Sequence, residues 1–339
     1  MPGMQLSRAF YTDVVRPLLA GVPHSAALIG PGSEVLDCDT ERSTDHDWGP
    51  RVLLFVPRGH TAAVSDTVTA HLPDTFAGYP TVFGSDRSPP RHGVHVTDTA
   101  TWFRDRLGFD PAQPLTTLDW LATPWQRLAE VTGGEVFHDG LNLLEPARAT
   151  LRWYPADLWR YILACQWDRI AESEAFPGRC GEAGDDLGSA VLTARLAADL
   201  QRLTLLMRRR YPPYAKWLGT AYTRLTGTAE TGEALSRATA ATGWREREHH
   251  LSLAYERTAA LHNRLNLTAP LDPAVRPYHD RPFQVLGGHR YATALRAGIT
   301  DPATAALPPA GSIDQFCDNT AVLTDPARAR TAARAVLGL

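Results

Sequence analysis

The N-terminal part of the chain combines helical periodicity with short apolar runs. Apolar residues recur at helical spacing over 6–20, and further helices are indicated at 62–72 and 117–131. Short apolar or alternating runs predict strands at 26–29, 52–56, 94–96 and 135–137. The first of these runs ends at Gly30-Pro31-Gly32, which is typical of a strand that leads into a glycine-rich loop. This order of elements predicts a mixed sheet flanked by helices.

From about residue 151 the pattern changes to long helices. Strand-like runs disappear, and helical periodicity is found at 155–175, 187–211, 213–226, 230–242 and 246–266. Two segments, 176–182 and 270–282, interrupt the helical pattern. The sequence therefore predicts an α+β protein with a sheet-containing domain over 1–148 and a helical-bundle domain over 149–339.

Composition and charge exclude several classes of protein. A chain of 339 residues with 44% hydrophobic content can form two ordinary cores, and a net charge of -3 argues against bulk binding of nucleic acid. The four cysteines are widely spaced and form no CxxC pair, which favours a reducing compartment over a disulfide framework or zinc knuckle. The sequence shows neither a secretory leader nor an apolar run long enough to cross a membrane. We therefore expect a cytoplasmic protein without a membrane partner.

Candidate chemistry lies between the first two predicted strands. Gly32 and Ser33 follow the first strand, and Asp45 and Asp47 stand shortly before the second. A glycine lets the backbone approach a phosphate closely, and a serine hydroxyl can donate to phosphate oxygens. Two carboxylates at i and i+2 on extended backbone project from the same face, where they can hold Mg²⁺. Such a pair can position a triphosphate and activate a nucleophile through bound metal.

This pattern resembles the signature of the DNA polymerase beta-like nucleotidyltransferase superfamily, in which a strand and Gly-Ser are followed by Asp-x-Asp and another strand. Here Gly32-Ser33 is followed by Ser43-Thr44-Asp45-His46-Asp47. The chain is also similar to a bacterial nucleotidyltransferase-like group with a domain of unknown function, through GPGSEVLDCDTERSTDHDWGPR, GGEVFHDG, GRCGEAGDDLGSA, PPYAKWLG, HDRPF and GSIDQF. The resemblance implies a nucleotidyltransferase domain over 1–148 and a helical domain over 149–339 that closes on substrate or nucleotide. It implies Mg²⁺ on Asp45 and Asp47, and ATP or another NTP as co-substrate.

Two features depart from the superfamily pattern. Residues 48–51 separate Asp47 from its strand, and Pro50 lacks a ladder donor, so we expect an edge position or a bulge there. The superfamily often has a third carboxylate on a later strand, where this chain has His95. His95 can act as the base, Asp98 can take over that role, or the third acid is missing. The sequence leaves these three alternatives open.

Four further residues and one acidic segment are candidates for contact with the nucleotide or the acceptor. Lys216 is the only lysine among 34 basic residues and lies between aromatic neighbours, so it is predicted to contact the phosphates. Arg42 is a second candidate for phosphate contact, with Ser43 and Thr44 beside it. Glu182 lies in an acidic, glycine-rich segment and can act as a general base or bind a cationic acceptor. An equally good interpretation is that this segment caps a helix.

The predicted reaction is transfer of a nucleoside monophosphate, with AMP from ATP as the first candidate, to a small-molecule acceptor. Pyrophosphate is the leaving group, and His95 or a carboxylate deprotonates the acceptor. One variant has a protein as the acceptor. The alternative is a non-catalytic nucleotide-binding regulatory protein that has lost the third acid.

Overall fold

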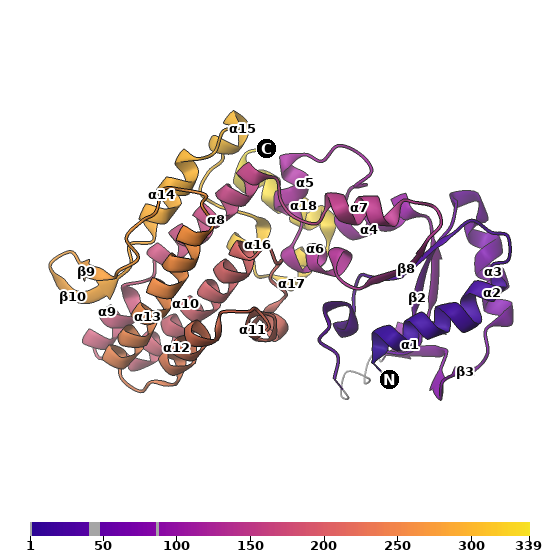
Figure 1. Cartoon of the computed structure of the whole chain (residues 1–339), viewed down its shortest axis with the longest axis horizontal. Coiled ribbons are helices and arrows are strands. Elements are labelled where there is room, and N and C mark those ends of the chain that lie inside the picture. The colour runs from indigo at the N-terminus through magenta and orange to yellow at the C-terminus, as the bar shows by residue number, and fades with distance from the viewer. Residues whose placement is uncertain (1, 41–47, 86–87) are drawn as a thin grey trace. The chain divides into compact units, whose positions relative to one another are not determined.

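The computed structural model describes residues 2–40, 48–85 and 88–339 (Figure 1). The chain divides into two compact units. Unit 1 consists of Met1–Asp119 and Gln126–Arg152, and unit 2 of Trp120–Trp125 and Trp153–Leu339. Helices and a mixed sheet together make this an α+β protein, as the sequence predicts. The functional domains predicted over 1–148 and 149–339 stay a prediction.

The main sheet of unit 1 contains the strands predicted from the apolar runs. Within the described residues its order is β7-β2-β1-β8. The strands span Ser25–Leu28 (β1), Val52–Phe55 (β2), Val94–Thr97 (β7) and Glu135–Asp139 (β8). β1 runs antiparallel to β2 and to β8, whereas β2 runs parallel to β7. The sheet is therefore mixed, and all four predicted strands are confirmed to within two residues.

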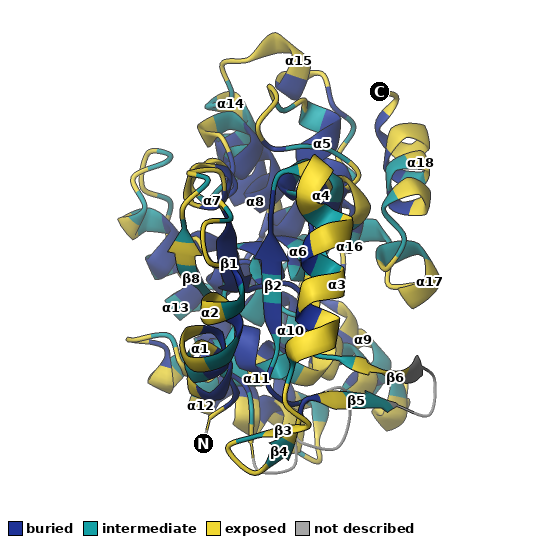
Figure 2. Ribbon diagram, turned by 90° about the vertical axis from the view of Figure 1, so that its right-hand side faces the viewer, coloured by how far each residue is buried: buried dark blue, intermediate teal, exposed yellow. Residues whose placement is uncertain are grey.

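Helices cover both faces of this sheet. The N-terminal helix runs through α1 (Gly3–Phe10), a π-helical turn (Tyr11–Val15) and α2 (Arg16–Leu18), and α3 spans Thr61–His71. Their apolar side chains pack against one face of the sheet, in a core that includes Phe10, Val52, Leu54, Val68 and Val94. On the other face, the ring of Phe55 contacts that of Trp102 at 5.7 Å between centroids. Trp102 belongs to α4 (Thr99–Leu107). Figure 2 shows β1 and β2 buried and the outer surface of α3 exposed.

The expectation that Pro50 places β2 at an edge or in a bulge was wrong. β2 lies inside the sheet, between β7 and β1, and begins only at Val52. The Val52 amide donates to the Gly93 carbonyl at 3.0 Å. Because the ladder begins two residues after Pro50, the missing donor of the proline removes no bond from the sheet.

Several smaller elements before residue 151 are not indicated by the sequence pattern, and one of them, α5, is shared between the two units. Short strands form two additional pairs, β3 (Thr75–Phe76) with β4 (Tyr79–Pro80) and β5 (Val82–Ser85) with β6 (Ser88–His92). The helix expected over 117–131 is divided into α5 (Thr117–Ala122) and α6 (Trp125–Thr132), because Pro124 interrupts it. α7 (Leu144–Thr150) follows β8.

Unit 2 is a helical bundle organised around one long helix. The predicted helices are confirmed as α8 (Ala156–Ala171), α10 (Asp186–Met207), α11 (Ala215–Thr223), α12 (Ala229–Ala240) and α13 (Trp244–Arg264). α10 packs against α8, α11, α12 and α13. Its buried residues include Leu196, Leu200 and Leu203, which follow helical spacing along its inner face.

Two expectations for unit 2 need correction. Residues 176–182 form a short helix, α9 (Phe176–Glu182), where a link between helices was expected. Strands also occur in this unit, because β9 (Arg276–Tyr278) and β10 (Arg281–Val285) form a hairpin. The chain continues through α14 (His289–Ala297), α15 (Pro302–Ala305), α16 (Ile313–Phe316), α17 (Thr320–Leu323) and α18 (Pro326–Leu337). Among the helices the structure describes, none combines the length and apolar character needed to cross a bilayer.

Candidate functional site

The strand directions of unit 1 bring three sequence segments to one edge of the sheet. β1 ends at this edge and continues into Gly30-Pro31-Gly32-Ser33. Because β2 is antiparallel to β1, it begins at the same edge, and β7 begins there too because it is parallel to β2. The glycine loop, the residues just before β2 and the start of β7 therefore meet at one end of the sheet.

The glycine loop has a backbone that depends on its glycines. Gly30 and Gly32 have φ angles of 89° and 144°, which other residues rarely adopt. The Gly30 amide donates to the Glu130 carbonyl at 2.9 Å, so it is already occupied. Ser33 begins a short 3₁₀ helix, Ser33–Leu36, and its hydroxyl has no hydrogen bond to any residue within the described ranges. The Gly30 amide is therefore not available to a phosphate, whereas the roles predicted for Gly32 and for the Ser33 hydroxyl stay a prediction.

Arg51, which the sequence analysis did not select, lies against this loop. Its guanidinium donates to the Pro31 carbonyl at 3.1 Å and forms an ion pair with Glu34. A Cβ on Gly32 would meet both Arg51 and Glu34, so glycine is required here for packing as well as for its φ angle. The Arg51 Nε is buried without a hydrogen-bond partner in the part of the chain that the structure describes.

A second group of charges lies beside Gly30. Arg106 of α4 forms an ion pair with Glu130 at 2.6 Å, and its Nε lies 3.9 Å from the position of a Cβ on Gly30. Within the described residues this Nε also lacks a hydrogen-bond partner. Arg127 is close enough to contribute: burial first, and then the charge of Arg106, lowers its pKa. Arg51, Arg106, Glu34 and Glu130 thus place two guanidinium groups and two carboxylates around the loop, and the nearby charge of Arg127 makes the group positive overall, which favours an anion.

The predicted metal site lies outside the described residues. Asp45 and Asp47, with Arg42, Ser43 and Thr44 beside them, belong to the segment 41–47 that the description omits. Their assignment as metal ligands and phosphate contacts stays a prediction. Among the residues that are described, no three His, Cys, Asp or Glu side chains are gathered in a way that would hold a metal ion.

His95 lies on β7, close to the edge where the glycine loop begins. It is paired with Leu53 of β2, which in turn is paired with Ala27 of β1, so the three side chains share one face of the sheet. The His95 side chain is exposed, yet surrounding protein atoms and then the charge of Arg91 lower its pKa, against an opposing effect of Asp105. A neutral imidazole can accept a proton, as a general base must.

Asp98, the alternative to His95, lies at the opposite end of β7. It is the N-cap of α4, and its carboxylate accepts a hydrogen bond from the Thr101 amide at 3.0 Å. Partial burial raises the pKa of Asp98, but the hydrogen bonds from Thr101 and the charges of Arg58 and Arg104 outweigh this effect and lower it. This is the environment of a structural helix cap, so the arrangement favours His95 over Asp98 as the third residue of the site.

Lys216 lies in unit 2, in the first turn of α11. Its side chain is exposed, and its ammonium stands 4.8 Å from the centre of the Trp217 ring. No carboxylate of the described residues lies within ion-pair distance of it. The position at a helix N-terminus adds the positive end of the helix dipole to the charge of the ammonium, which favours contact with an anion.

Glu182 is the last residue of α9 and is exposed. The neighbouring Asp185 is the N-cap of α10, and its carboxylate accepts from the Gly188 amide at 2.7 Å. The capping interpretation is therefore confirmed for Asp185, whereas a catalytic role for Glu182 stays a prediction.

Sequence reasoning missed the arginines around the glycine loop. Arg51 could have been noticed because it directly precedes β2, which starts at the edge where the loop ends. Arg106 and Arg127 give no comparable signal, since only the folding of α4 and α6 brings Arg106 beside the loop and Arg127 near Arg106.

Comparisons with known proteins add one finding. Residues 120–218 match a domain of unknown function (DUF4037). The matched range includes Glu182 and Lys216 but not the glycine loop or the segment with Asp45 and Asp47. No curated protein and no solved structure gives a significant match.

Proposed function

We propose that this protein is a Mg²⁺-dependent nucleotidyltransferase that moves the nucleoside monophosphate of an NTP, with ATP as the first candidate, to an acceptor. The observation that carries the proposal is the meeting of the glycine loop, the start of β2 and His95 at one sheet edge. In the superfamily that the sequence resembles, Gly-Ser follows the first of these strands, Asp-x-Asp stands beside the second, and a later strand often supplies the base or a metal ligand. A small-molecule acceptor is proposed first, with a protein acceptor as the variant.

The charges around the loop support the polyphosphate part of the proposal. Arg51 and Arg106 each carry a buried Nε that makes no hydrogen bond among the described residues, although the same guanidinium groups are ion-paired through other nitrogens. A buried donor without a partner is costly, and a phosphate oxygen would satisfy it. Ser33 offers a hydroxyl at the same loop. These groups fit a polyanion better than a neutral ligand.

The metal is proposed on Asp45 and Asp47. Their carboxylates supply the hard oxygen ligands that Mg²⁺ prefers, and they precede β2, whose first residue lies at the edge described above. When bound there, Mg²⁺ would neutralise phosphate charge and lower the pKa of an acceptor hydroxyl. His95, on the neighbouring strand β7, would take the proton from the acceptor.

The test uses ATP labelled at the α-phosphate, with Mg²⁺ and an extract of small molecules. A parallel reaction contains a protein fraction freed of small molecules. Transfer of label and release of pyrophosphate are measured for the wild type, for Asp45→Asn and Asp47→Asn, and for the control Asp66→Asn. Asp66 is exposed on α3 and distant in sequence from the predicted motif. Asn keeps the shape of Asp but removes the charge that holds the cation.

We expect the wild type and Asp66→Asn to transfer label, and both motif variants to be inactive with unchanged thermal unfolding. Full activity of the double Asn variant would contradict the proposal. His95→Ala then tests the base: a lower turnover with unchanged ATP affinity supports His95 in that role. The fraction that becomes labelled identifies the acceptor as a small molecule or a protein.

One observation favours a second candidate function, a nucleotide-binding regulatory protein without turnover. The Glu34 carboxylate, only 6% exposed, occupies the space beside Gly32 through its ion pair with Arg51. A phosphate entering there would have to displace this carboxylate, because like charges repel. Tight Mg²⁺-dependent ATP binding with no release of pyrophosphate, in the presence of both extracts, would support this candidate over the enzyme.

A further inference from the structure

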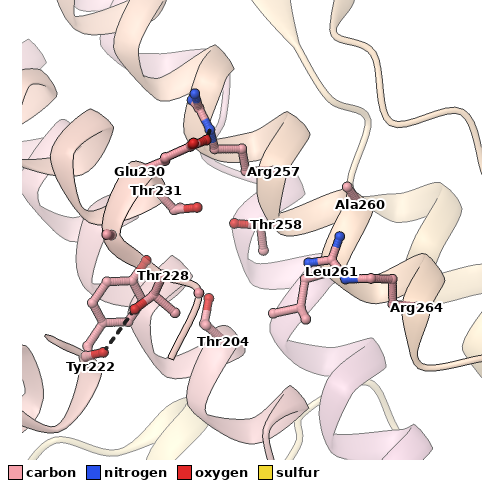
Figure 3. Close-up of a pocket in the computed structure, with 12 residues that line it drawn as sticks. Thr204, Tyr222, Thr228, Glu230, Thr231, Arg257, Thr258, Ala260, Leu261 and Arg264 are labelled. Atoms are coloured by element: carbon pink, nitrogen blue, oxygen red, sulfur yellow. Dashed lines mark hydrogen bonds and ion pairs between the residues drawn. The ribbon is translucent and has the colours of Figure 1, made fainter. Parts of the chain in front are cut away.

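Unit 2 contains a pocket of its own, formed where the start of α12 meets α13 (Figure 3). Its volume is about 460 Å³, which is enough for a small metabolite. Its walls come from α10, from the end of α11 and its connection to α12, from the first turn of α12, and from the face of α13 that carries Arg257 and Arg264. They belong to three stretches of sequence, at 204, 222–231 and 257–264, and most of the lining residues are polar.

The first turn of α12 directs backbone donors toward the pocket. Ala229, Glu230 and Thr231 line it, and the Gly232 amide is the first to bond within the helix, donating to the Thr228 carbonyl at 2.8 Å. The amides before it have no partner within the helix, as at every helix start. The N-cap residue Thr228 does not satisfy them with its side chain, because its hydroxyl donates backwards to the Leu225 carbonyl at 2.8 Å.

Tyr222 supplies an independent observation. The residue is 1% exposed and lines the pocket, and its hydroxyl has no hydrogen-bond partner of good geometry in the described chain. Burial raises its pKa to about 12, and the Thr231 hydroxyl on the same pocket wall lowers it only in part. The phenol therefore stays protonated and is a buried donor directed at the pocket. A buried hydroxyl without an acceptor is destabilising, and a bound oxygen atom would remove that cost.

The α13 side of the pocket is cationic. Arg257 and Arg264 lie seven residues apart, on one face of α13. Arg257 is paired with Glu230 at 3.2 Å, whereas Arg264 has no ion pair with any residue in the described part of the chain. The charged residues of the pocket wall, Arg257, Arg264 and Glu230, therefore have a net charge of +1. This charge and the positive end of the α12 dipole both favour an anion.

Threonine oxygens form the rest of the polar lining. Thr204 and Thr258 are buried, and their hydroxyls donate to backbone carbonyls of their own helices at 2.8 and 2.7 Å. Since these protons are committed, the oxygens face the pocket as hydrogen-bond acceptors. Figure 3 shows the hydroxyls of Thr231 and Thr258 pointing toward each other across the pocket. The pocket thus has donors for an anion, from the start of α12, Tyr222 and Arg264, and acceptors for ligand hydroxyls, from Thr204 and Thr258.

We propose that this pocket binds a small phosphorylated molecule that carries hydroxyl groups. The phosphate would accept hydrogen bonds from the start of α12 and from the Tyr222 hydroxyl, and Arg264, on the opposite wall, would add an attractive positive charge. Hydroxyl groups of the same ligand would donate to the oxygens of Thr204 and Thr258. This site is separate from the glycine loop, and the proposal does not depend on nucleotidyl transfer.

The test is isothermal titration of the full-length protein with glycerol 3-phosphate, with inorganic phosphate, and with glycerol as the uncharged reference. Tyr222→Phe removes one oxygen and keeps the ring, and Arg264→Gln removes the unpaired charge. The control is Arg195→Gln, an exposed arginine on α10 that does not line the pocket. All titrations are repeated in the Asp45→Asn, Asp47→Asn background, which separates this site from the proposed nucleotide site.

We expect glycerol 3-phosphate to bind more tightly than inorganic phosphate, and glycerol not to bind. Tyr222→Phe and Arg264→Gln should each weaken binding about tenfold, since the first removes a hydrogen bond to a charged group and the second removes an attractive charge. Arg195→Gln and the Asn background should leave the affinity unchanged. The proposal is overturned if no phosphate compound binds at millimolar concentration. It is also overturned if Tyr222→Phe binds like the wild type, or if Arg195→Gln weakens binding as much as Arg264→Gln does.

Discussion

Replacement of Gly32 by alanine tests the role assigned to the glycine loop. Gly32 has φ 144° and ψ 139°, a region that is open essentially to glycine alone. Residues held in such regions raise the free energy of the folded state by about 1 to 3 kcal/mol. The new Cβ would also lie 2.7 Å from the Glu34 Oε2 and in contact with the Arg51 guanidinium. Moving Glu34 would disturb a nearly buried carboxylate and its ion pair.

We therefore expect Gly32→Ala to lower the free energy of unfolding by at least about 1 to 3 kcal/mol, from the backbone alone. Separation of the Arg51–Glu34 pair would add to this, because a buried charge that loses its partner is strongly destabilising. The measurement is urea unfolding followed by circular dichroism, together with titration of Mg²⁺-ATP. The variant should also bind ATP more weakly, since Ser33 and Arg51 would shift with the loop.

Gly21→Ala is the matched control. Gly21 has φ 81°, and a Cβ there meets no atom within 4 Å. It should lose only the smaller left-handed backbone term, about 1 kcal/mol, and should keep its affinity for ATP. The reasoning is refuted if Gly32→Ala unfolds within about 0.5 kcal/mol of the wild type, or if Gly21→Ala and Gly32→Ala are equally impaired in both measurements.

Three other substitutions give independent checks. Burial lowers the pKa of His262 to about 4, so the imidazole is protonated at a higher pH in the unfolded chain than in the folded protein. The free energy of unfolding should therefore fall as the pH drops below about 6.5 and level off near pH 4. Between pH 7.5 and 4.5 the wild type should lose about 2 to 3 kcal/mol more than His262→Gln in urea titrations, and equal losses would contradict this. Asp98→Ala should lower the free energy of unfolding by about 1 kcal/mol, whereas Asp98→Asn should stay close to the wild type, because either Asp or Asn can cap α4. A loss of turnover with unchanged stability would instead restore Asp98 as a catalytic candidate. Lys216→Arg should impair nucleotidyl transfer nearly as much as Lys216→Ala, with little change in melting temperature, because a forked guanidinium does not replace a compact ammonium. Pyrophosphate release at the wild-type rate by Lys216→Arg would remove this lysine from the site.

Helices and strands with a regular apolar pattern could be predicted because that pattern is local. The strands at 26–29 and 52–56 and the long helices of unit 2 bury one face or both, and burial fixes the spacing of their apolar residues. α9 was missed because its seven residues include a proline and two glycines, and the β9–β10 hairpin because its strands are short. Too few apolar positions fall in such elements for a period to show.

The candidate site was predicted in the same uneven way. The glycine loop, Ser33 and His95 were selected because loop and strand ends are visible in the sequence, and the observed strand pairing brings them to one edge. The strand pairing also shows that His95 lies near the start of β7 and Asp98 just after its end, a distinction that could not be made from the sequence, where the two residues are only three positions apart. Asp45 and Asp47 lie outside the described residues, so their role as metal ligands stays a prediction.

The sequence by itself determined the α+β class, the order of strands and helices along the chain, and the glycine loop at the end of β1. Each of these depends on residue spacing within about twenty positions, where periodicity and turn residues carry the information. Only the tertiary structure decided which charges surround the loop, because Arg106 and Glu130 are 24 residues apart. The same is true of the pocket in unit 2, whose donors and acceptors come from four segments between Thr204 and Arg264. Contacts between distant segments depend on how the elements pack, and no local pattern records them.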